Sequence, residues 1–291
     1  MPLTGENRRS LTAIHLAVIL FGFPGLFAKW ISAPAPVIVL GRVAFAGIFL
    51  ALILPLARVS FRVIPVRDLG ALVLCGAVLA VHWSAFFQSV RVSSVAVGLL
   101  AYSSFPLFTV FLEPLMTRER LDAVHVLMAL VCLFGVFLIV PRFSFDDAVF
   151  RGVLWGLLAG ATFAFLTVIN KRLTVRHPSL KIAFYQDLFA CLALLPFFAG
   201  RAPALSGRDV LLLAVLGVFC TAGAHTLFIQ GMKRVKAQTA SLISALEPVY
   251  GILLAFLFLG EIPAPRTVAG GAVILGAVLW VTARSAGKPG L

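Results

Sequence analysis

The sequence predicts an all-α membrane protein in which ten transmembrane helices form two inverted five-helix repeats around a central cavity. The first observation behind this fold class is composition: hydrophobic residues make up 61% of the 291 residues, charged residues make up 12%, and the mean hydropathy is +1.07. A soluble domain carries about 25% charged residues because it needs a polar surface. The second observation is a series of apolar segments, and the third is an internal repeat.

Ten apolar segments, separated by polar and charged residues, are each about long enough to cross the hydrocarbon layer as a helix. Their hydrophobicity is continuous, whereas the strands of a membrane β-barrel alternate between apolar and polar residues. We expect the spans at Leu11–Trp30, Pro36–Leu56, Asp68–Gln88, Val92–Glu113, Asp122–Val140, Val149–Asn170, Leu180–Phe198, Asp209–Gln230, Ala237–Gly260 and Arg266–Thr282.

The stretch Val81–Pro114 occurs a second time in the chain. Any two apolar helices resemble each other, so only matches between polar residues or prolines carry weight. A single constant shift along the chain superimposes four such pairs: Gln88 and Gln230, Arg91 and Lys233, Pro106 and Pro248, Glu119 and Glu261. Four matches at one unbroken offset indicate an internal duplication.

The distribution of positive charge predicts the orientation. Of the 24 Lys and Arg residues, 16 lie on the side of the N-terminus and 7 on the opposite side, while Arg42 falls within a span. Because cytoplasmic loops carry the excess of Lys and Arg, we expect both termini in the cytoplasm. The chain is expected to cross the membrane many times.

The duplication and the orientation together predict an inverted pair. Each copy holds five spans, and five is odd, so the second copy enters the membrane upside down relative to the first. We expect the repeats at residues 11–142 and 149–284, joined near Phe143–Arg151. Inverted pairs of this kind build transporters whose site near the bilayer midplane opens alternately to each side.

The remaining composition argues against several kinds of partner. The formal net charge is +13, but the charges lie in short loops where orientation signals belong, so nucleic-acid binding is not expected. The four cysteines lie inside apolar spans without metal-ligand spacing, so we predict no disulfide, no metal site and no cofactor. The expected partners are a small-molecule solute and the lipid bilayer. The sequence leaves the oligomeric state open and is compatible with a monomer.

The third span offers the first candidate binding residues. His82 and Phe86 are four residues apart on one helical face, and Trp83 lies next to them. Imidazole and indole together offer hydrogen-bonding groups and a flat apolar surface for a ligand. The alternative is that Trp83 anchors the helix at the membrane interface while His82 bonds a carbonyl group of a neighbouring helix.

The fourth span places Tyr102 on one stripe with Gly98 and Pro106, and Ser103 can satisfy the turn that the proline loosens. We expect either a hinge that lines the cavity or a static packing kink. The repeat puts Ser244 opposite Tyr102 and Pro248 opposite Pro106. Residues expected to bind substrate are His82, Trp83, Phe86, Tyr102, Ser103, Tyr185 and Ser244, and residues expected to act as hinges are Pro24, Gly98, Pro106 and Pro248.

Charged residues inside the spans form a second group of candidates, since each costs roughly 2.5 to 3.5 kcal/mol at a helix centre. Glu247 immediately precedes Pro248 at midspan, where it is either protonated or paired with a cation. Arg42 is its natural partner, and Asp187 belongs to the same polar network. Glu247 could couple transport to the proton gradient, or it could be a structural acid.

The span pattern resembles the drug/metabolite transporter superfamily, and specifically its ten-span group with two EamA-type halves. The residues that carry the likeness are Phe27–Trp30, Pro36–Arg42 and the paired segments Leu100–Glu119 and Leu242–Glu261. The first half departs from the pattern at Met116–Glu119, where Leu-Gly is usual before Glu. With the His82-Trp83 pair, the chain is most similar to bacterial exporters of amino acids, including aromatic ones.

This resemblance implies a basket of helices around a central cavity and efflux across the inner membrane. The function we expect is secondary transport that exports small amphiphilic metabolites, amino acids above all, by alternating access. An intramembrane lipid-modifying enzyme would need clustered acids, histidines or a nucleophile with a base, and the chain offers only scattered single groups. A passive channel is the other alternative, although no filter sequence is visible.

Overall fold

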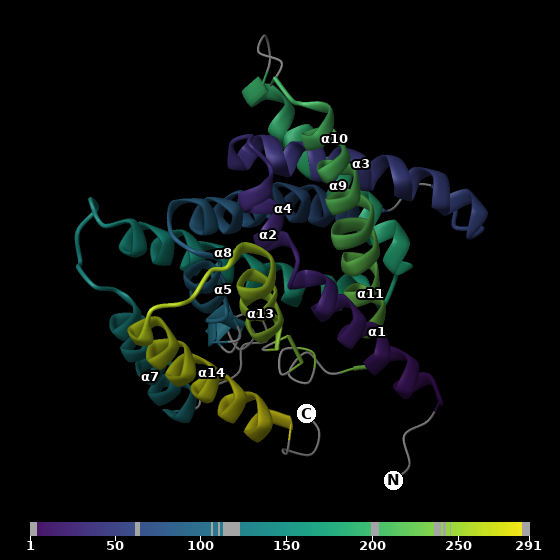
Figure 1. Ribbon diagram of the computed structural model, residues 1–291. Coiled ribbons are helices and arrows are strands. Elements are labelled where there is room, and N and C mark those ends of the chain that lie inside the picture. The colour runs from purple at the N-terminus through teal and green to yellow at the C-terminus, as the bar shows by residue number, and fades with distance from the viewer. Residues whose placement is uncertain are drawn as a thin grey trace.

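The computed structural model describes residues 5–61, 65–105, 107–109, 111–112, 123–198, 204–235, 240, 243–244 and 246–286, and within these ranges it contains helices and no strands. Figure 1 shows the helices crossing one another in a bundle. Six are long and apolar enough to span a membrane: Arg9–Trp30, Ala35–Leu56, Val66–Val92, Ala148–Leu173, Ser179–Phe198 and Gly207–Gly231. Multiple membrane-length helices confirm the predicted all-α membrane class.

Four shorter apolar helices lie where the fourth, fifth, ninth and tenth spans are expected. They cover Val95–Thr109, Val126–Ile139, Glu247–Leu259 and Pro265–Trp280. The number of membrane crossings therefore stays a prediction of the sequence. Pro106, one of the predicted hinges, lies outside the described residues.

The first half begins with a broken span. Helix α1 (Gly5–Phe21) ends just before Gly22, and α2 (Pro24–Trp30) begins with Pro24 in its first turn. Proline lacks an N–H group and is favoured in the first turn of a helix, so Pro24 suits the start of the second piece. The first half continues with α3 (Ala35–Leu56), α4 (Val66–Val92), α5 (Val95–Tyr102) and α7 (Ala123–Ile139).

The second half begins with α8 (Ala148–Leu173) and α9 (Ser179–Leu194), which ends in the short helix η1 (Leu195–Phe198). The next span consists of α10 (Gly207–Val215), the π-helical segment η2 (Leu216–Gly223) and α11 (Ala224–Gly231). Within η2 the Thr221 hydroxyl donates to the Leu216 carbonyl oxygen, five residues earlier, at 2.9 Å. Helices α13 (Glu247–Leu259) and α14 (Pro265–Ala286) complete the chain.

The packing of the two halves is symmetric under their exchange. Helix α4 of the first half packs against α8 and α9 of the second half. Its counterparts make the equivalent contacts from the second half, α11 with α1 and η2 with α3. Two further contacts join counterparts directly, α3 with α9 and α7 with α14, and the second pair lies side by side in Figure 1. Helix α5 also packs against α8 and α13.

Two lysines at helix ends repeat one interaction at the offset that relates the two copies. Lys29 Nζ donates to the Ser93 carbonyl oxygen at 3.2 Å, and Lys171 Nζ donates to the Val235 carbonyl oxygen at 3.2 Å. Both acceptors follow the end of a span, where carbonyl groups lack partners within the helix. Each lysine therefore ties the end of its own span to the end of the neighbouring one.

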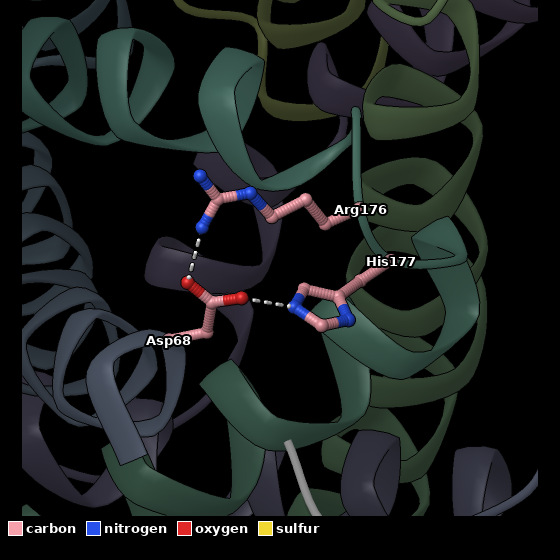
Figure 2. A network of polar contacts seen from close by, with 3 residues as sticks. All are labelled: Asp68, Arg176 and His177. Carbon is pink, nitrogen blue, oxygen red and sulfur yellow. Dashed lines mark hydrogen bonds and ion pairs between the residues drawn. The ribbon is translucent and has the colours of Figure 1, made fainter. Parts of the chain in front are cut away.

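Acidic residues at the starts of two spans also correspond. Asp68, in the first turn of α4, accepts from Arg176 at 3.0 Å and contacts His177 at 2.8 Å, both in the loop between α8 and α9 (Figure 2). Asp209, in the first turn of α10, accepts from the backbone N–H of Ser32 at 3.2 Å, between α2 and α3. Each acid thus links a span to a loop of the other half.

Close approach of α8 to the first half depends on three glycines spaced four residues apart. A Cβ atom on Gly152 would collide with Ser93, and one on Gly156 would lie 2.5 Å from the Ala101 Cβ atom. A Cβ atom on Gly160 would lie 2.9 Å from the Tyr102 carbonyl oxygen. Small residues let membrane helices pack at short distance, as the sequence pattern of these glycines indicates.

We therefore expect Gly156→Ala to destabilise the protein by about 1–3 kcal/mol, because the added methyl group forces α5 and α8 apart. Thermal unfolding in detergent, followed by circular dichroism, measures the effect as a lower Tm. Gly47→Ala is the matched control, since a Cβ atom there meets nothing within 4 Å. Equal melting temperatures for both variants would contradict the tight packing of α8.

Candidate functional site

A cavity lies between the two halves, with an empty volume of about 600 Å³ that includes its opening. Both halves contribute side chains to its wall, from the broken first span through to the start of α13. The lining residues are Phe21, Pro24, Arg42, Leu79, His82, Trp83, Phe86, Tyr102, Phe163, Leu166, Thr167, Asn170, His225, Phe228 and Glu247. Four of the predicted binding residues, His82, Trp83, Phe86 and Tyr102, are thus brought together on one cavity.

The wall of the cavity repeats at the same offset as the sequence. Four pairs of lining residues are related in this way: Phe21 and Phe163, Pro24 and Leu166, Trp83 and His225, Phe86 and Phe228. The symmetry is broken chemically at Glu247, whose counterpart is the apolar Phe105. The acid of the cavity therefore lies on the second half, facing aromatic rings of the first.

His82 bonds a neighbouring helix and also lines the cavity. Its Nδ1 atom lies 2.9 Å from the Ala159 carbonyl oxygen of α8. A carbonyl oxygen can only accept, so Nδ1 carries the hydrogen and Nε2 of the neutral ring is an acceptor. The ring also stacks on Phe163 at a centroid distance of 5.2 Å and lines the cavity.

Aromatic rings form most of the remaining wall. Tyr102 stacks on Phe105 at 5.4 Å and meets Phe86 and Phe163 edge-on, at 5.8 Å and 5.5 Å between centroids. Phe228 continues this surface from the second half and lies 5.9 Å from Phe163. Such a wall binds flat apolar groups and excludes water from the polar groups beside it.

Arg42 lies inside the membrane bundle, with 1% of its side chain surface exposed. Its guanidinium carbon is 3.9 Å from the centroid of the Trp83 ring, so Trp83 faces a cation inside the bundle. Nε donates to the Thr221 hydroxyl at 2.8 Å and Nη2 donates to the Cys220 carbonyl oxygen at 3.4 Å, both in η2. Among the described residues, no carboxylate forms an ion pair with Arg42 within 4.0 Å.

Glu247 is buried at the start of α13 and faces the same cavity. Tyr102 lines the cavity beside it, and Oε2 of Glu247 has no hydrogen-bond partner. Nδ1 of His225, another lining residue, also lacks a partner. The predicted partners Arg42 and Glu247 both line this cavity, but their side chains form no ion pair within 4.0 Å.

The other predicted site residues lie elsewhere. Ser103 donates to the Leu99 carbonyl oxygen at 2.7 Å, and the Ser244 hydroxyl is buried without a partner. Tyr185 is not among the lining residues, and its hydroxyl donates to the Phe61 carbonyl oxygen at 3.0 Å. Asp187 is fully buried in α9, and neither carboxyl oxygen has a hydrogen-bond partner.

Of the predicted hinges that the structure describes, Pro24 and Pro248 lie at helix starts, whereas Gly98 lies within α5. Pro24 and Pro248 each lie in the first turn of a helix, next to the break in the first span and at the start of α13. Gly98 packs closely on α4, where a Cβ atom would lie 2.7 Å from Val90 Cγ2. Whether these positions move stays a prediction.

Sequence reasoning missed His225, Phe163 and Phe228. The repeat carries a signal for all three, because the constant offset between the copies relates them to Trp83, Phe21 and Phe86. The offset applied to the candidates Trp83 and Phe86 leads to His225 and Phe228, whereas the partner of Phe163, Phe21, was not itself a candidate. Within the described ranges, no group of three or more His, Cys, Asp or Glu side chains is placed to hold a metal ion.

Comparisons with known proteins agree with this architecture. The sequence profile of the EamA-like transporter family matches residues 8–140 and again residues 150–283. A solved crystal structure, 24% identical, superimposes with a TM-score of 0.66 over 96% of this chain and 99% of that chain, which supports the fold alone.

Curated relatives include an uncharacterized transporter of Archaeoglobus fulgidus, 30% identical over 92% of this chain and 94% of that protein. The uncharacterized transporter YxxF of Bacillus subtilis is 24% identical over 99% of this chain and 94% of its own. An S-adenosylmethionine uptake transporter of Rickettsia felis is 24% identical over 72% of this chain and 70% of that protein. With a family match over both halves, the chain belongs to the EamA-like transporter family and is a membrane transporter rather than an enzyme.

Proposed function

We propose that this transporter exports amphiphilic amino acids, including aromatic ones, by alternating access of the central cavity. One observation carries the proposal. A buried guanidinium without a carboxylate within 4.0 Å, a carboxyl group with an unpartnered oxygen and an aromatic wall meet around the same space. Opposite unpaired groups in a cavity complement a ligand that bears both charges.

Each group of the proposed ligand has a partner on the wall. The carboxylate of an amino acid binds Arg42, whose planar guanidinium suits this geometry. Its ammonium group binds Glu247 Oε2 and His225 Nδ1, which have no partner in the protein. Its side chain packs on the rings of Phe86, Tyr102 and Phe163, which favours apolar and aromatic side chains.

The repeat supports alternating access as the mechanism. Two halves with exchangeable packing can adopt two equivalent arrangements in which the cavity faces opposite sides. If the halves are inverted, the interactions of Lys29 and Lys171 lie at opposite membrane surfaces, and each arrangement breaks one set. The helix starts at Pro24 and Pro248 lie beside the cavity, where a moving segment would need them.

A second candidate is uptake of S-adenosylmethionine or a similar compound. The Rickettsia felis relative is named for this activity. S-adenosylmethionine also combines an amino-acid group with a flat aromatic ring, so it meets the same chemical requirements. The direction of transport separates the two functions.

Counterflow in proteoliposomes tests the function directly. We expect an excess of an unlabelled amino acid outside to accelerate the loss of labelled phenylalanine from vesicles that contain this protein alone. The panel covers the twenty amino acids and S-adenosylmethionine, and vesicles without protein are the control. Loss at a rate independent of external solute would indicate a pore, and acceleration by S-adenosylmethionine alone would favour the second candidate.

Charge-removing variants test the assigned ligand contacts. Arg42→Gln and Glu247→Gln should each weaken phenylalanine binding about tenfold or more, since a hydrogen bond to a charged group contributes about 1.5–3 kcal/mol. Binding is measured by scintillation proximity on purified protein.

Two analogues serve as internal controls for these variants. Phenethylamine lacks the carboxylate and should lose little affinity in Arg42→Gln, while 3-phenylpropionate lacks the ammonium group and should lose little in Glu247→Gln. If both variants weaken all three compounds equally, the charged contacts are assigned wrongly.

The proposed orientation has its own test. In a cysteine-free background, Val175→Cys should be protected from an impermeant maleimide in intact cells, because the loop between α8 and α9 is expected in the cytoplasm. Arg208→Cys, exposed at the opposite ends of the helices, should be labelled. The reverse pattern would invert the assigned orientation, and with it the meaning of export.

A further inference from the structure

Asp187 is a buried acid that the proposed ligand contacts do not use. It lies in α9 with none of its side chain exposed, and both of its carboxyl oxygens lack a hydrogen-bond partner. An ionised carboxylate in such a place costs several kcal/mol unless a cation or donors compensate it. The environment of Asp187 in this structure therefore suits a protonated, neutral carboxyl group.

The helices packed against α9 supply one cation near the middle of the bundle. At that level, the titratable side chains on these neighbouring helices are Arg42 on α3, Cys75 and His82 on α4, and His225 on α11. Cys191 follows on α9 itself, and Cys220 lies on η2 beside Arg42. Of these groups, Arg42 is the one whose charge attracts the Asp187 carboxyl group.

Arg42 is nevertheless turned toward other partners. Its guanidinium lies over Trp83 and bonds the Thr221 hydroxyl, without an ion pair to Asp187 within 4.0 Å. A buried guanidinium next to an ionised carboxylate would form that ion pair, because no water competes for it. The two side chains therefore stand in an arrangement that a proton on Asp187 would stabilise.

We propose that Asp187 is a proton-binding site that decides whether Arg42 faces the cavity. With the proton bound, Arg42 stays on Trp83 and is available to a ligand carboxylate. When the proton leaves, the guanidinium swings from Trp83 and Thr221 to the Asp187 carboxylate, and the cavity loses its cation. The proton is exchanged with the side to which the cavity is open.

This switch reaches beyond the cavity through Thr221. The hydroxyl that accepts from Arg42 also donates to the Leu216 carbonyl oxygen and holds the π-helical segment η2. Departure of Arg42 removes a link between α3 and η2, which come from different halves. The effect of proton release on ligand binding rests on the proposed function. The proton site itself does not.

Trp83 reports the position of Arg42 without any substrate. The chain has four tryptophans, and a triple variant leaves Trp83 as the single one. Its substitutions are Trp30→Phe, Trp155→Phe and Trp280→Phe. In nanodiscs, the emission of Trp83 should change with pH in one step as the stacked guanidinium moves away. Asp187→Asn should abolish this step and keep the low-pH emission at every pH, and Arg42→Gln should also abolish it.

The neighbouring titratable groups are tested in the same background. His82 and His225 lie 6.4 Å and 5.9 Å from Trp83 between ring centroids, so their titration could also alter its emission. We expect the step to persist in His225→Asn, His82→Asn and Glu247→Gln. Asp187→Glu keeps an acid and should retain the step at a shifted pH. This variant is the control for loss of the step through misfolding of Asp187→Asn.

The proposal is overturned if the parent variant shows no step between pH 4 and 9, or if the step survives in Asp187→Asn. Loss of the step in His225→Asn alone would also overturn it, because the histidine would then be the titrating group. None of these outcomes depends on counterflow. A protein that fails to transport amino acids can still show the switch, and an active transporter can lack it.

Discussion

A charge inside an apolar helix bundle has to find partners there, and Arg42 is the charge around which this molecule is arranged. The Trp83 ring, the Thr221 hydroxyl and the Cys220 carbonyl oxygen come from α4 and η2, while Arg42 itself comes from α3. These contacts join both halves at the cavity. The two acceptors take hydrogen bonds from two of the guanidinium nitrogens but do not neutralise the charge, which stays available to an anionic group.

Duplication supplies the geometry in which such a charge can be useful. The two halves bring corresponding positions to the same cavity, so Trp83 meets His225 and Phe21 corresponds to Phe163. Divergence then supplies the chemistry, because Glu247 replaces a phenylalanine and His225 replaces a tryptophan in the second half. A symmetric scaffold with an asymmetric wall suits a ligand whose two ends differ.

The fold was largely predictable from the sequence, since hydrophobic run length and offset matches report directly on spans and duplication. The cavity was predictable where a polar or aromatic residue interrupts an apolar span, as at His82, Trp83 and Glu247. Tyr185 was expected at the cavity and instead bonds Phe61, because periodicity gives a helix face but not the neighbour it meets. The π-helical turn of η2 has no composition signal, and neither does the stacking of Arg42 on Trp83, which depends on three helices at once.

In the proposed mechanism, one zwitterionic ligand bridges Arg42 and Glu247 across the cavity. Solid-state NMR on the protein in lipid measures this contact directly. The bound phenylalanine carries ¹³C in its carboxyl group and ¹⁵N in its amino group, and the arginine residues of the protein carry ¹⁵N. We expect the phenylalanine carboxyl carbon within hydrogen-bonding reach of a guanidinium nitrogen, and the contact absent in Arg42→Gln. Bound phenylalanine that shows no arginine contact, or one that persists without Arg42, would contradict the account.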